Sequence, residues 1–146
     1  MKRTGALVVV FTMTLSALPL AHVTVRPRES KAGAEERYTV RVPTEGTVST
    51  TMVRLEVPAG VIVLDVEKTN DATVETEKQD DRIVSITWKK EIKPKEAAEF
   101  AFRARNPESH EEIAWKAHQQ FADGTVADWV GAAGDRRPAA ITKLGK

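Results

Sequence analysis

Histidine is the residue type whose positions in this sequence bear most directly on possible chemistry. There are three histidines, His22, His110 and His118, and imidazole nitrogen is a common ligand for transition metals. His110 lies in the segment Asn106–His110, which has loop composition, so we expect its ring to be solvated. His118 falls on the polar face of a predicted strand, beside Gln120. Neither position indicates a metal ligand by itself.

His22 differs because a chain cut just before it would begin with histidine. The α-amine and the ring Nδ1 of an N-terminal histidine close a six-membered chelate ring around a metal ion. The amine has an ordinary pKa of about 7.7–8.0, so it gives up its proton to a metal near neutral pH. Two nitrogens in this arrangement suit Cu(II), and a carboxylate would complete the plane. Without such a cut, His22 is an exposed residue of the first strand.

The composition excludes several other kinds of site. The sequence has no cysteine, so it holds no disulfide, no cysteine-bound zinc and no iron–sulfur cluster. It contains no Ser-His-Asp or Cys-His pattern, no glycine-rich phosphate loop and no clear acid–base pair of carboxylates. The formal net charge is +1, which gives no reason to expect a nucleic-acid partner. With 41% hydrophobic residues, the 146-residue chain is expected to form one globular domain.

Residues 1–21 have the layout of a secretory signal peptide. A positive start precedes residues 4–20, which carry no charge, and Ala21 is a small residue suited to the position before the cut. Pro19, at the third position before the cut, is not the small residue that the cleavage pattern favours. We predict cleavage between Ala21 and His22 and export to the periplasm or the extracellular space. A signal anchor that stays attached is the alternative.

Alternation of apolar and polar residues with a period of two dominates the rest of the chain and predicts β-strands. The dipeptide Asp123-Gly124, set between two such runs, is a strong β-hairpin pattern. We predict an all-β fold, an antiparallel immunoglobulin- or fibronectin-like β-sandwich of seven to nine strands. Residues 131–146 are rich in glycine, alanine and charge and are expected to be only partly ordered. The predicted core includes the aromatic residues that share a face with aliphatic neighbours, which are Trp88, Phe100, Phe102 and Trp115.

Trp129 has a position that the alternation leaves ambiguous. It shares one side of a predicted strand with Ala127, whereas Val126, Asp128 and Val130 point to the other side. An indole close to a metal ion would exclude water and add a cation–π interaction. Packing at the edge of the sandwich is the alternative role.

Four segments, in their order along the chain, resemble the YcnI-like copper-binding domain family. These segments are Ala21–Pro27, Tyr38–Glu45, Trp115–Gly124 and Asp128–Gly131. The similarity extends from His22 to about Thr142. The resemblance implies an extracytoplasmic β-sandwich that binds Cu(II) through a monohistidine brace. It also implies that His22 supplies amine and imidazole, Glu45 supplies a carboxylate, and Trp129 lies close to the copper ion.

The carboxylate assigned by the resemblance has two competitors in the sequence. Glu45 follows Pro43 in a predicted loop, from which a carboxylate reaches the beginning of the first strand. Glu35 or Glu36 would take its place if the alignment were shifted. The implied domain covers residues 22–142, followed by a tail at 143–146.

The implied function is copper handling outside the cytosol, as a chaperone, a storage protein or a delivery protein, and not as an enzyme. The expected partners are the copper ion and a membrane copper transporter or a copper-delivery protein. Many relatives carry a membrane anchor after the domain. No apolar run of about 20 residues follows the domain in this sequence, so we expect no C-terminal membrane anchor.

Two other classes of function stay open at this point. A copper-dependent oxidative enzyme would need a second histidine ligand, and His118 would have to lie within bonding distance of the metal held by His22. A metal-free adhesion or interaction sandwich would need no ligand residues, and copper would then leave its melting temperature unchanged.

Overall fold

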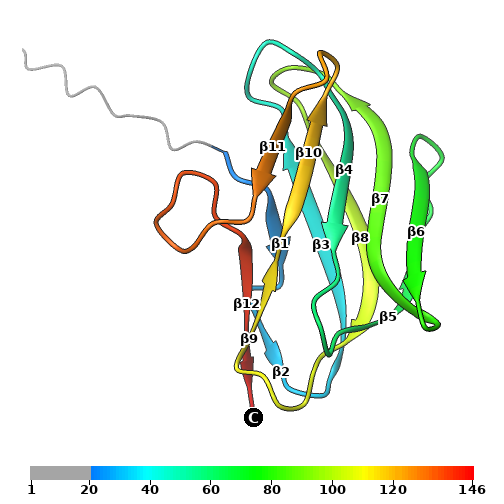
Figure 1. Cartoon of the computed structure of the whole chain (residues 1–146), viewed down its shortest axis with the longest axis vertical. Coiled ribbons are helices and arrows are strands. Elements are labelled where there is room, and N and C mark those ends of the chain that lie inside the picture. Colours follow the sequence, from blue (N-terminus) through cyan, green and yellow to red (C-terminus); the bar gives the residue numbers. More distant parts are fainter. Residues whose placement is uncertain (1–20) are drawn as a thin grey trace, which may run out of the picture.

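The computed structural model describes residues 21–146 as twelve β-strands in three sheets, and no helix is present in this range (Figure 1). The predicted signal peptide, apart from Ala21, lies outside the described residues. Within residues 21–146 there is accordingly no helix that is long and apolar enough to cross a membrane.

Each sheet combines strands that are distant in the sequence. In spatial order, the four-stranded sheet contains β1 (Thr24–Arg26), β3 (Glu35–Pro43), β8 (Ala97–Arg105) and β5 (Ile62–Val66). The five-stranded sheet contains β11 (Val126–Trp129), β10 (Ala117–Phe121), β4 (Thr50–Glu56), β7 (Arg82–Ile92) and β6 (Thr73–Gln79). The three-stranded sheet contains β2 (Glu29–Lys31), β12 (Ala140–Gly145) and β9 (Glu112–Trp115).

The two larger sheets form the layers of a sandwich, and the three-stranded sheet continues it at the lower end of Figure 1. The strand pairs are antiparallel except β12 with β2, which is parallel. Pro27 follows β1 directly, and β1 ends there because proline has no N–H to donate to a strand ladder. The prediction of an antiparallel β-sandwich is thus confirmed.

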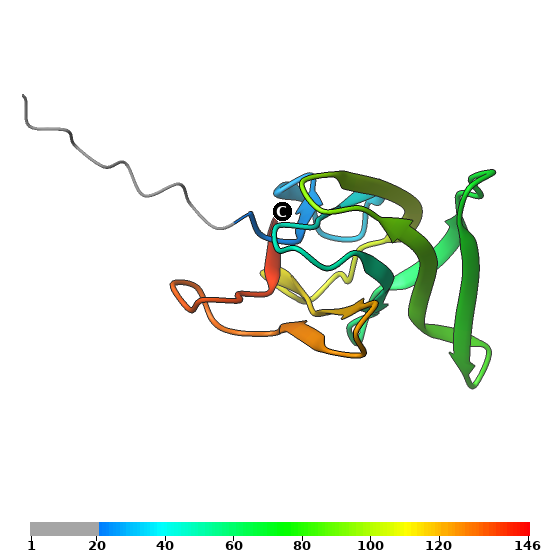
Figure 2. The ribbon, with the colours of Figure 1, turned by 90° about the horizontal axis from the view of Figure 1, so that it is seen from above.

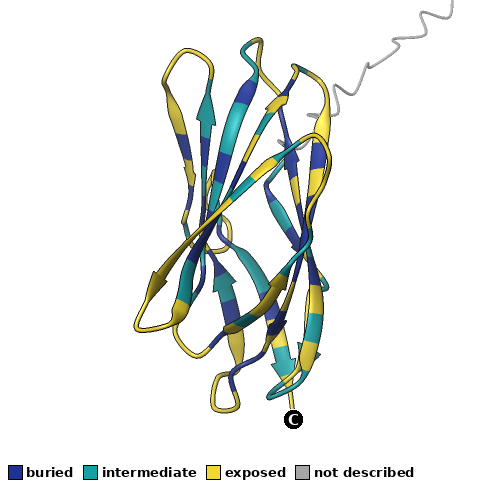
Figure 3. Ribbon diagram, turned by 90° about the vertical axis from the view of Figure 1, so that its right-hand side faces the viewer, coloured by how far each residue is buried: buried dark blue, intermediate teal, exposed yellow. Residues whose placement is uncertain are grey.

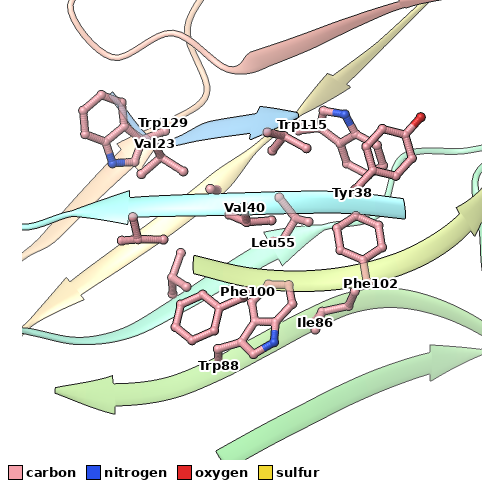
Figure 4. Packing of buried hydrophobic residues seen from close by; sticks show 14 of the residues in the cluster. Val23, Tyr38, Val40, Leu55, Ile86, Trp88, Phe100, Phe102, Trp115 and Trp129 are labelled. Atoms are coloured by element: carbon pink, nitrogen blue, oxygen red, sulfur yellow. The ribbon is translucent and has the colours of Figure 1, made fainter. Parts of the chain in front are cut away.

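The core lies between the two layers, and Figure 3 shows buried positions recurring along the strands. The four aromatic residues predicted to be in the core, Trp88, Phe100, Phe102 and Trp115, are all buried. Trp88 stacks on Phe100 with ring centroids 5.2 Å apart, and Phe102 lies edge-on to Trp115 at 5.5 Å (Figure 4). This burial follows from the period-two alternation, since residues i and i+2 of a strand share one face.

The structure has twelve strands rather than the seven to nine predicted, and the extra strands have identifiable causes. β2 has three residues, which is too few for alternation to be recognised. β9 and β10 form one continuous run in the sequence because only Lys116 separates them. β6 is an edge strand with mostly exposed residues, and a strand that is solvated on both faces has no alternating pattern to detect.

The C-terminal segment is more ordered than the sequence indicated. β12 continues to Gly145 and pairs with both β2 and β9, so the segment expected to be a tail belongs to a sheet. Thr142 is fully buried in this strand. Its hydroxyl accepts a hydrogen bond from Nε1 of Trp115 at 3.0 Å and donates one to the carbonyl of Pro27 at 2.9 Å.

Phe102 provides a test of the core packing. Its ring contacts the rings of Tyr38, Trp88 and Trp115. We therefore expect Phe102→Ala to lower the free energy of unfolding by about 3–5 kcal/mol. The control is Val126→Ala, at a residue that is 51% exposed, where the change should be within about 0.5 kcal/mol. Urea denaturation followed by tryptophan fluorescence measures both, and equal effects would contradict this placement of Phe102.

Candidate metal centre

The first described residues and the loop after β3 lie side by side because β1 pairs with β3. The antiparallel register sets Thr24 opposite Arg41, so the chain that leads into β1 runs beside the chain that leaves β3. At this end the backbone N–H of Ala21 donates a hydrogen bond to Oε1 of Glu45 at 2.8 Å. Two segments 24 residues apart in the sequence are therefore joined at one place.

The β10–β11 hairpin brings a third segment to this place. In its turn, Oδ1 of Asp123 accepts hydrogen bonds from the backbone N–H and the hydroxyl of Thr125. Gly124 has a φ of 85°, a conformation that glycine adopts without a steric penalty. The hairpin predicted from the Asp-Gly dipeptide is thus confirmed, and it fixes the direction of β11.

Trp129 lies at the end of β11 on the inner face of the sheet. Its register partner on β10 is Ala117, and the indole is only 8% exposed. The ring of Trp129 lies 5.7 Å from the ring of His22, with an angle of 54° between the planes. Figure 4 shows the indole beside Val23. The burial of Trp129, which the alternation left open, is settled by this geometry.

A buried polar network ties the indole of Trp129 to the start of the loop that carries Glu45. Nε1 of Trp129 donates to Oε1 of Gln119 at 3.0 Å. Nε2 of Gln119 donates in turn to the carbonyl of Pro43 at 2.9 Å and to the hydroxyl of Thr50 at 2.8 Å. Gln119 is 1% exposed, so these contacts replace the hydrogen bonds that water would make.

Two threonine hydroxyls extend this network into the five-stranded sheet. The hydroxyls of Thr44 and Thr50 are 2.6 Å apart, and that of Thr44 also donates to the carbonyl of Ile92 at 3.0 Å. The sequence did not single out Gln119, because glutamine is usually a surface residue. The available indication was that Gln119 lies two positions from Ala117, on the apolar side of its strand.

The ring of His22 and the carboxylate of Glu45 are the side chains at this place that suit a metal ion. Cu(II) accepts imidazole nitrogen and carboxylate oxygen in tetragonal sites. Within residues 21–146, no group of three or more His, Cys, Asp or Glu side chains is placed to hold a metal. The main chain is another source of a nitrogen donor at this place. The 2.8 Å contact from Ala21 N to Glu45 Oε1 shows that a main-chain nitrogen reaches this carboxylate.

A cavity of about 500 Å³ lies next to Glu45, whereas His22 lines a separate cavity of about 230 Å³. Its lining includes Ala21, Glu45, Gln119 and Trp129. A volume of this size falls in the range of small-molecule sites. Small solutes can therefore approach the carboxylate of Glu45 from the cavity side.

The competing carboxylates lie at the other end of β3. Glu35 and Glu36 begin this nine-residue strand, and a strand of that length spans roughly 30 Å. Glu35 pairs with two arginines of β8, and Glu36 accepts a hydrogen bond from the hydroxyl of Ser30 at 2.8 Å. The structure therefore brings Glu45, and neither Glu35 nor Glu36, next to Ala21.

His118 lies on the outer face of the five-stranded sheet. Its register partner is Asp128, so it points to the side opposite to Trp129. Nδ1 of His118 is 2.6 Å from Oδ1 of Asp128, and Nε2 is 2.8 Å from Oε2 of Glu56. Both ring nitrogens are thus engaged, and the sheet separates them from the ring of His22. An oxidative copper site with His118 as second ligand does not fit this geometry.

His110 is also remote from the candidate site. It is exposed in the loop between β8 and β9. It lines a separate cavity with Pro58 and Pro107, at the end of the sandwich where β3 begins and β8 ends.

The two carboxylates around His118 change its protonation. Burial lowers the pKa of His118, but its hydrogen bonds to Asp128 and Glu56, together with their negative charges, outweigh it and raise the pKa above its ordinary value. The folded structure therefore favours the imidazolium form more than an ordinary environment does, and this ring bridges β4 and β11 across β10.

This raised pKa makes the stability depend on pH. A group whose pKa is higher in the folded state stabilises it fully below the ordinary value of about 6.5, and the contribution is lost as the pH rises through the raised value. We expect His118→Gln to lower the free energy of unfolding more at about pH 6 than at about pH 9. Urea denaturation at both pH values tests this, and Asp128→Asn should remove part of the dependence. A constant difference at the two pH values would contradict the bridge.

Gln119 allows a test of the buried network. Gln119→Leu leaves the indole N–H of Trp129 and the carbonyl of Pro43 without their partners. We expect the free energy of unfolding to fall by about 1–3 kcal/mol for each unpaired group. Gln120→Leu, on the outer face of the same strand, is the control and should change it by less than about 0.5 kcal/mol. Thermal denaturation of the two variants gives the comparison, and equal losses would contradict the network.

Comparison with known proteins connects this site to a family. The family model described as "Domain of unknown function (DUF1775)" matches residues 22–144. The chain is 39% identical over 127 residues to the copper-binding protein CutI of Bacillus subtilis (strain 168). The matched region covers 85% of this chain. The chain spans 62% of the length of that relative. These matches confirm the YcnI-like resemblance of the four sequence segments.

Two solved structures support the fold. An uncharacterised protein from Nocardia farcinica, described as having an immunoglobulin-like fold, has a TM-score of 0.74 and 25% identity, over 86% of this chain and 99% of that one. A non-cellulosomal cohesin from Archaeoglobus fulgidus has a TM-score of 0.52 and 10% identity, over 86% and 91% of the two chains, and shows the fold alone. The immunoglobulin-like fold and the copper-binding relative support the prediction that the chain is not an enzyme. Because the family model covers residues 22–144, the chain belongs to the DUF1775 family.

Proposed function

We propose that this chain is an exported protein that binds Cu(II) at the N-terminus of its processed form and serves in copper handling. Cleavage between Ala21 and His22 would release the protein into the periplasm or the extracellular space. His22 then supplies its α-amine and ring Nδ1, Glu45 supplies a carboxylate oxygen, and Trp129 covers one side of the site.

The convergence of three distant segments carries this proposal. Ala21 N lies 2.8 Å from Glu45 Oε1, and the ring of His22 lies 5.7 Å from that of Trp129. Removal of Ala21 takes away the N–H that now occupies the carboxylate of Glu45. The new amine then belongs to His22, the residue that follows Ala21, so the amine and the imidazole of His22 lie near the carboxylate of Glu45.

The chemistry of these groups suits Cu(II) as a cargo ion. The amine and the imidazole of one residue form a chelate, and with a carboxylate they fill three positions of a tetragonal nitrogen and oxygen site. Both nitrogens must be unprotonated to bind, so uptake of the metal releases protons. The indole of Trp129, held by Gln119, limits the access of water from the protein side.

The comparison supports copper as the metal, because a relative with 39% identity is named a copper-binding protein. The signal-like residues 1–21 support export. A protein that accepts a copper ion and later releases it would act as a chaperone, a storage protein or a delivery protein. We propose a membrane copper transporter or a copper-delivery protein as the partner.

The deciding experiment compares the chain that begins at His22 with one that has an additional alanine before His22. We expect the first to bind one Cu(II) per chain. The additional residue converts the amine into an amide and removes the chelate. The affinity should then fall by more than about 100-fold, since even outer-shell changes cost about 10–100-fold. Competition with a chromophoric chelator gives the affinity, and electron paramagnetic resonance (EPR) gives the ligand set.

Matched variants separate the ligands from the rest of the protein. Glu45→Gln should weaken binding less than the additional alanine does, because an amide oxygen remains. His110→Ala, in the loop at the other end of the sandwich, should leave the affinity unchanged. If the form with the additional alanine binds one Cu(II) as tightly as the form that begins at His22, the N-terminal chelate is wrong.

A further inference from the structure

The loop between β11 and β12 contributes two arginines to the cavity beside the candidate metal centre. Arg136 and Arg137 line this cavity together with Glu45 and Trp129. Seen from above (Figure 2), the loop and the first described residues project on the same side of the molecule. Two positively charged side chains thus line the same cavity as Glu45, one of the proposed ligands.

Hydrogen bonds within the backbone give this loop a defined shape. The N–H of Gly131 donates to the carbonyl of Arg137 at 2.9 Å, and the N–H of Ala139 donates to the carbonyl of Gly131 at 2.9 Å. A Cβ at Gly131 would lie 2.9 Å from the Cβ of Asp135 and 3.0 Å from the carbonyl oxygen of Arg137, so this close approach favours glycine. Arg137 is held next to a residue that comes two positions after Trp129.

The guanidinium groups of these arginines are available to an anion. Within residues 21–146, no ion pair joins Arg136 or Arg137 to a carboxylate. Both residues are exposed. The acidic residues that line the cavity are Glu45 and Asp123. Glu45 is the proposed copper ligand, and Asp123 is hydrogen-bonded within its own turn.

The rest of the cavity lining indicates what kind of anion fits. Val48, Phe121, Ala127 and Trp129 give the cavity an apolar wall. The volume of about 500 Å³ matches a small organic molecule rather than a protein surface. A ligand with an apolar body and a carboxylate end suits such a lining, because arginine binds carboxylates through a planar pair of donors. Inorganic phosphate has no part that would use the apolar wall.

We propose that this cavity binds a small organic dicarboxylate, with one carboxylate on Arg136 and Arg137 and the other on the copper ion. The inference rests on the proposed function, because it uses the coordination position that three protein ligands leave open in a tetragonal Cu(II) site. The cavity would then receive copper together with a small carboxylate ligand, and the arginines would distinguish that complex from the bare ion.

The test uses the chain that begins at His22, loaded with one equivalent of Cu(II), with loading verified by EPR before any carboxylate is added. Succinate, glutarate and adipate are then titrated, with butyrate as the monocarboxylate control. We expect at least one dicarboxylate to change the copper spectrum and to bind roughly tenfold or more tightly than butyrate, the effect of one charge-assisted hydrogen-bond pair.

Variants of the exposed arginines assign the second carboxylate. Arg136→Gln/Arg137→Gln should bring the affinity for the dicarboxylate down to that for butyrate. Arg82→Gln, at the start of β7 in the β6–β7 hairpin on the opposite side of Figure 1, is the matched control and should bind as the unmodified protein does. Circular dichroism verifies that all three proteins are folded.

The outcomes separate this inference from the proposed function. Failure to load copper at the first step would overturn the proposed function. Normal loading, followed by equal binding of dicarboxylates and butyrate, or by full binding in the double variant, would overturn the dicarboxylate site. Equal binding of the dicarboxylate to the metal-free protein would overturn the contact with copper.

Discussion

The pairing of β1 with β3 is the constraint on which the candidate site depends. β1 has three residues at the edge of its sheet, and its register with β3 sets the place of everything before Thr24. A slip of one residue would turn each side chain of β1 to the other face. Val23 and Val25, which are 3% and 2% exposed, resist such a slip because both are buried in the core. The burial of Val23 and Val25 therefore fixes the position of the adjacent residue His22, and no metal ion is needed for this.

Two of the three buried tryptophans, Trp88 and Trp129, show how polar contacts add direction to packing. Trp88 is held by its apolar body, and its Nε1 has no hydrogen-bond partner within the described residues. The Nε1 of Trp129 donates to Gln119, which is bound in turn to Pro43 and Thr50. A buried network in which each member is paired resists rearrangement, because breaking one contact leaves several groups unsatisfied. This network therefore connects the indole of Trp129 to Pro43, two residues before Glu45.

The sequence was sufficient for the fold class, for the aromatic core and for the Asp-Gly hairpin, because these depend on local alternation and turn chemistry. It was not sufficient for β12, whose stability comes from pairing with β2 and β9 rather than from an apolar pattern. It also left open which glutamate lies next to Ala21, since that depends on the β1–β3 register and not on spacing. Gln119 and the arginine loop were missed for a related reason. A buried glutamine and a pair of surface arginines become informative only when the residues facing them are known.

His22 and His118 have different roles, since one is a proposed metal ligand and the other stabilises the sheet. The first strand begins at Thr24, two residues after His22, so the described sandwich does not need the proposed ligands in order to form. His118, by contrast, belongs to the stability of the sheet, since its ring joins two carboxylates from neighbouring strands. One histidine is thus committed to the fold, whereas His22 precedes the first strand. In the proposed function, cleavage of the single peptide bond before His22 converts its amide nitrogen into a chelating amine. Cleavage would then supply the chelating amine, whereas folding would bring that amine next to Glu45 through the β1–β3 pairing.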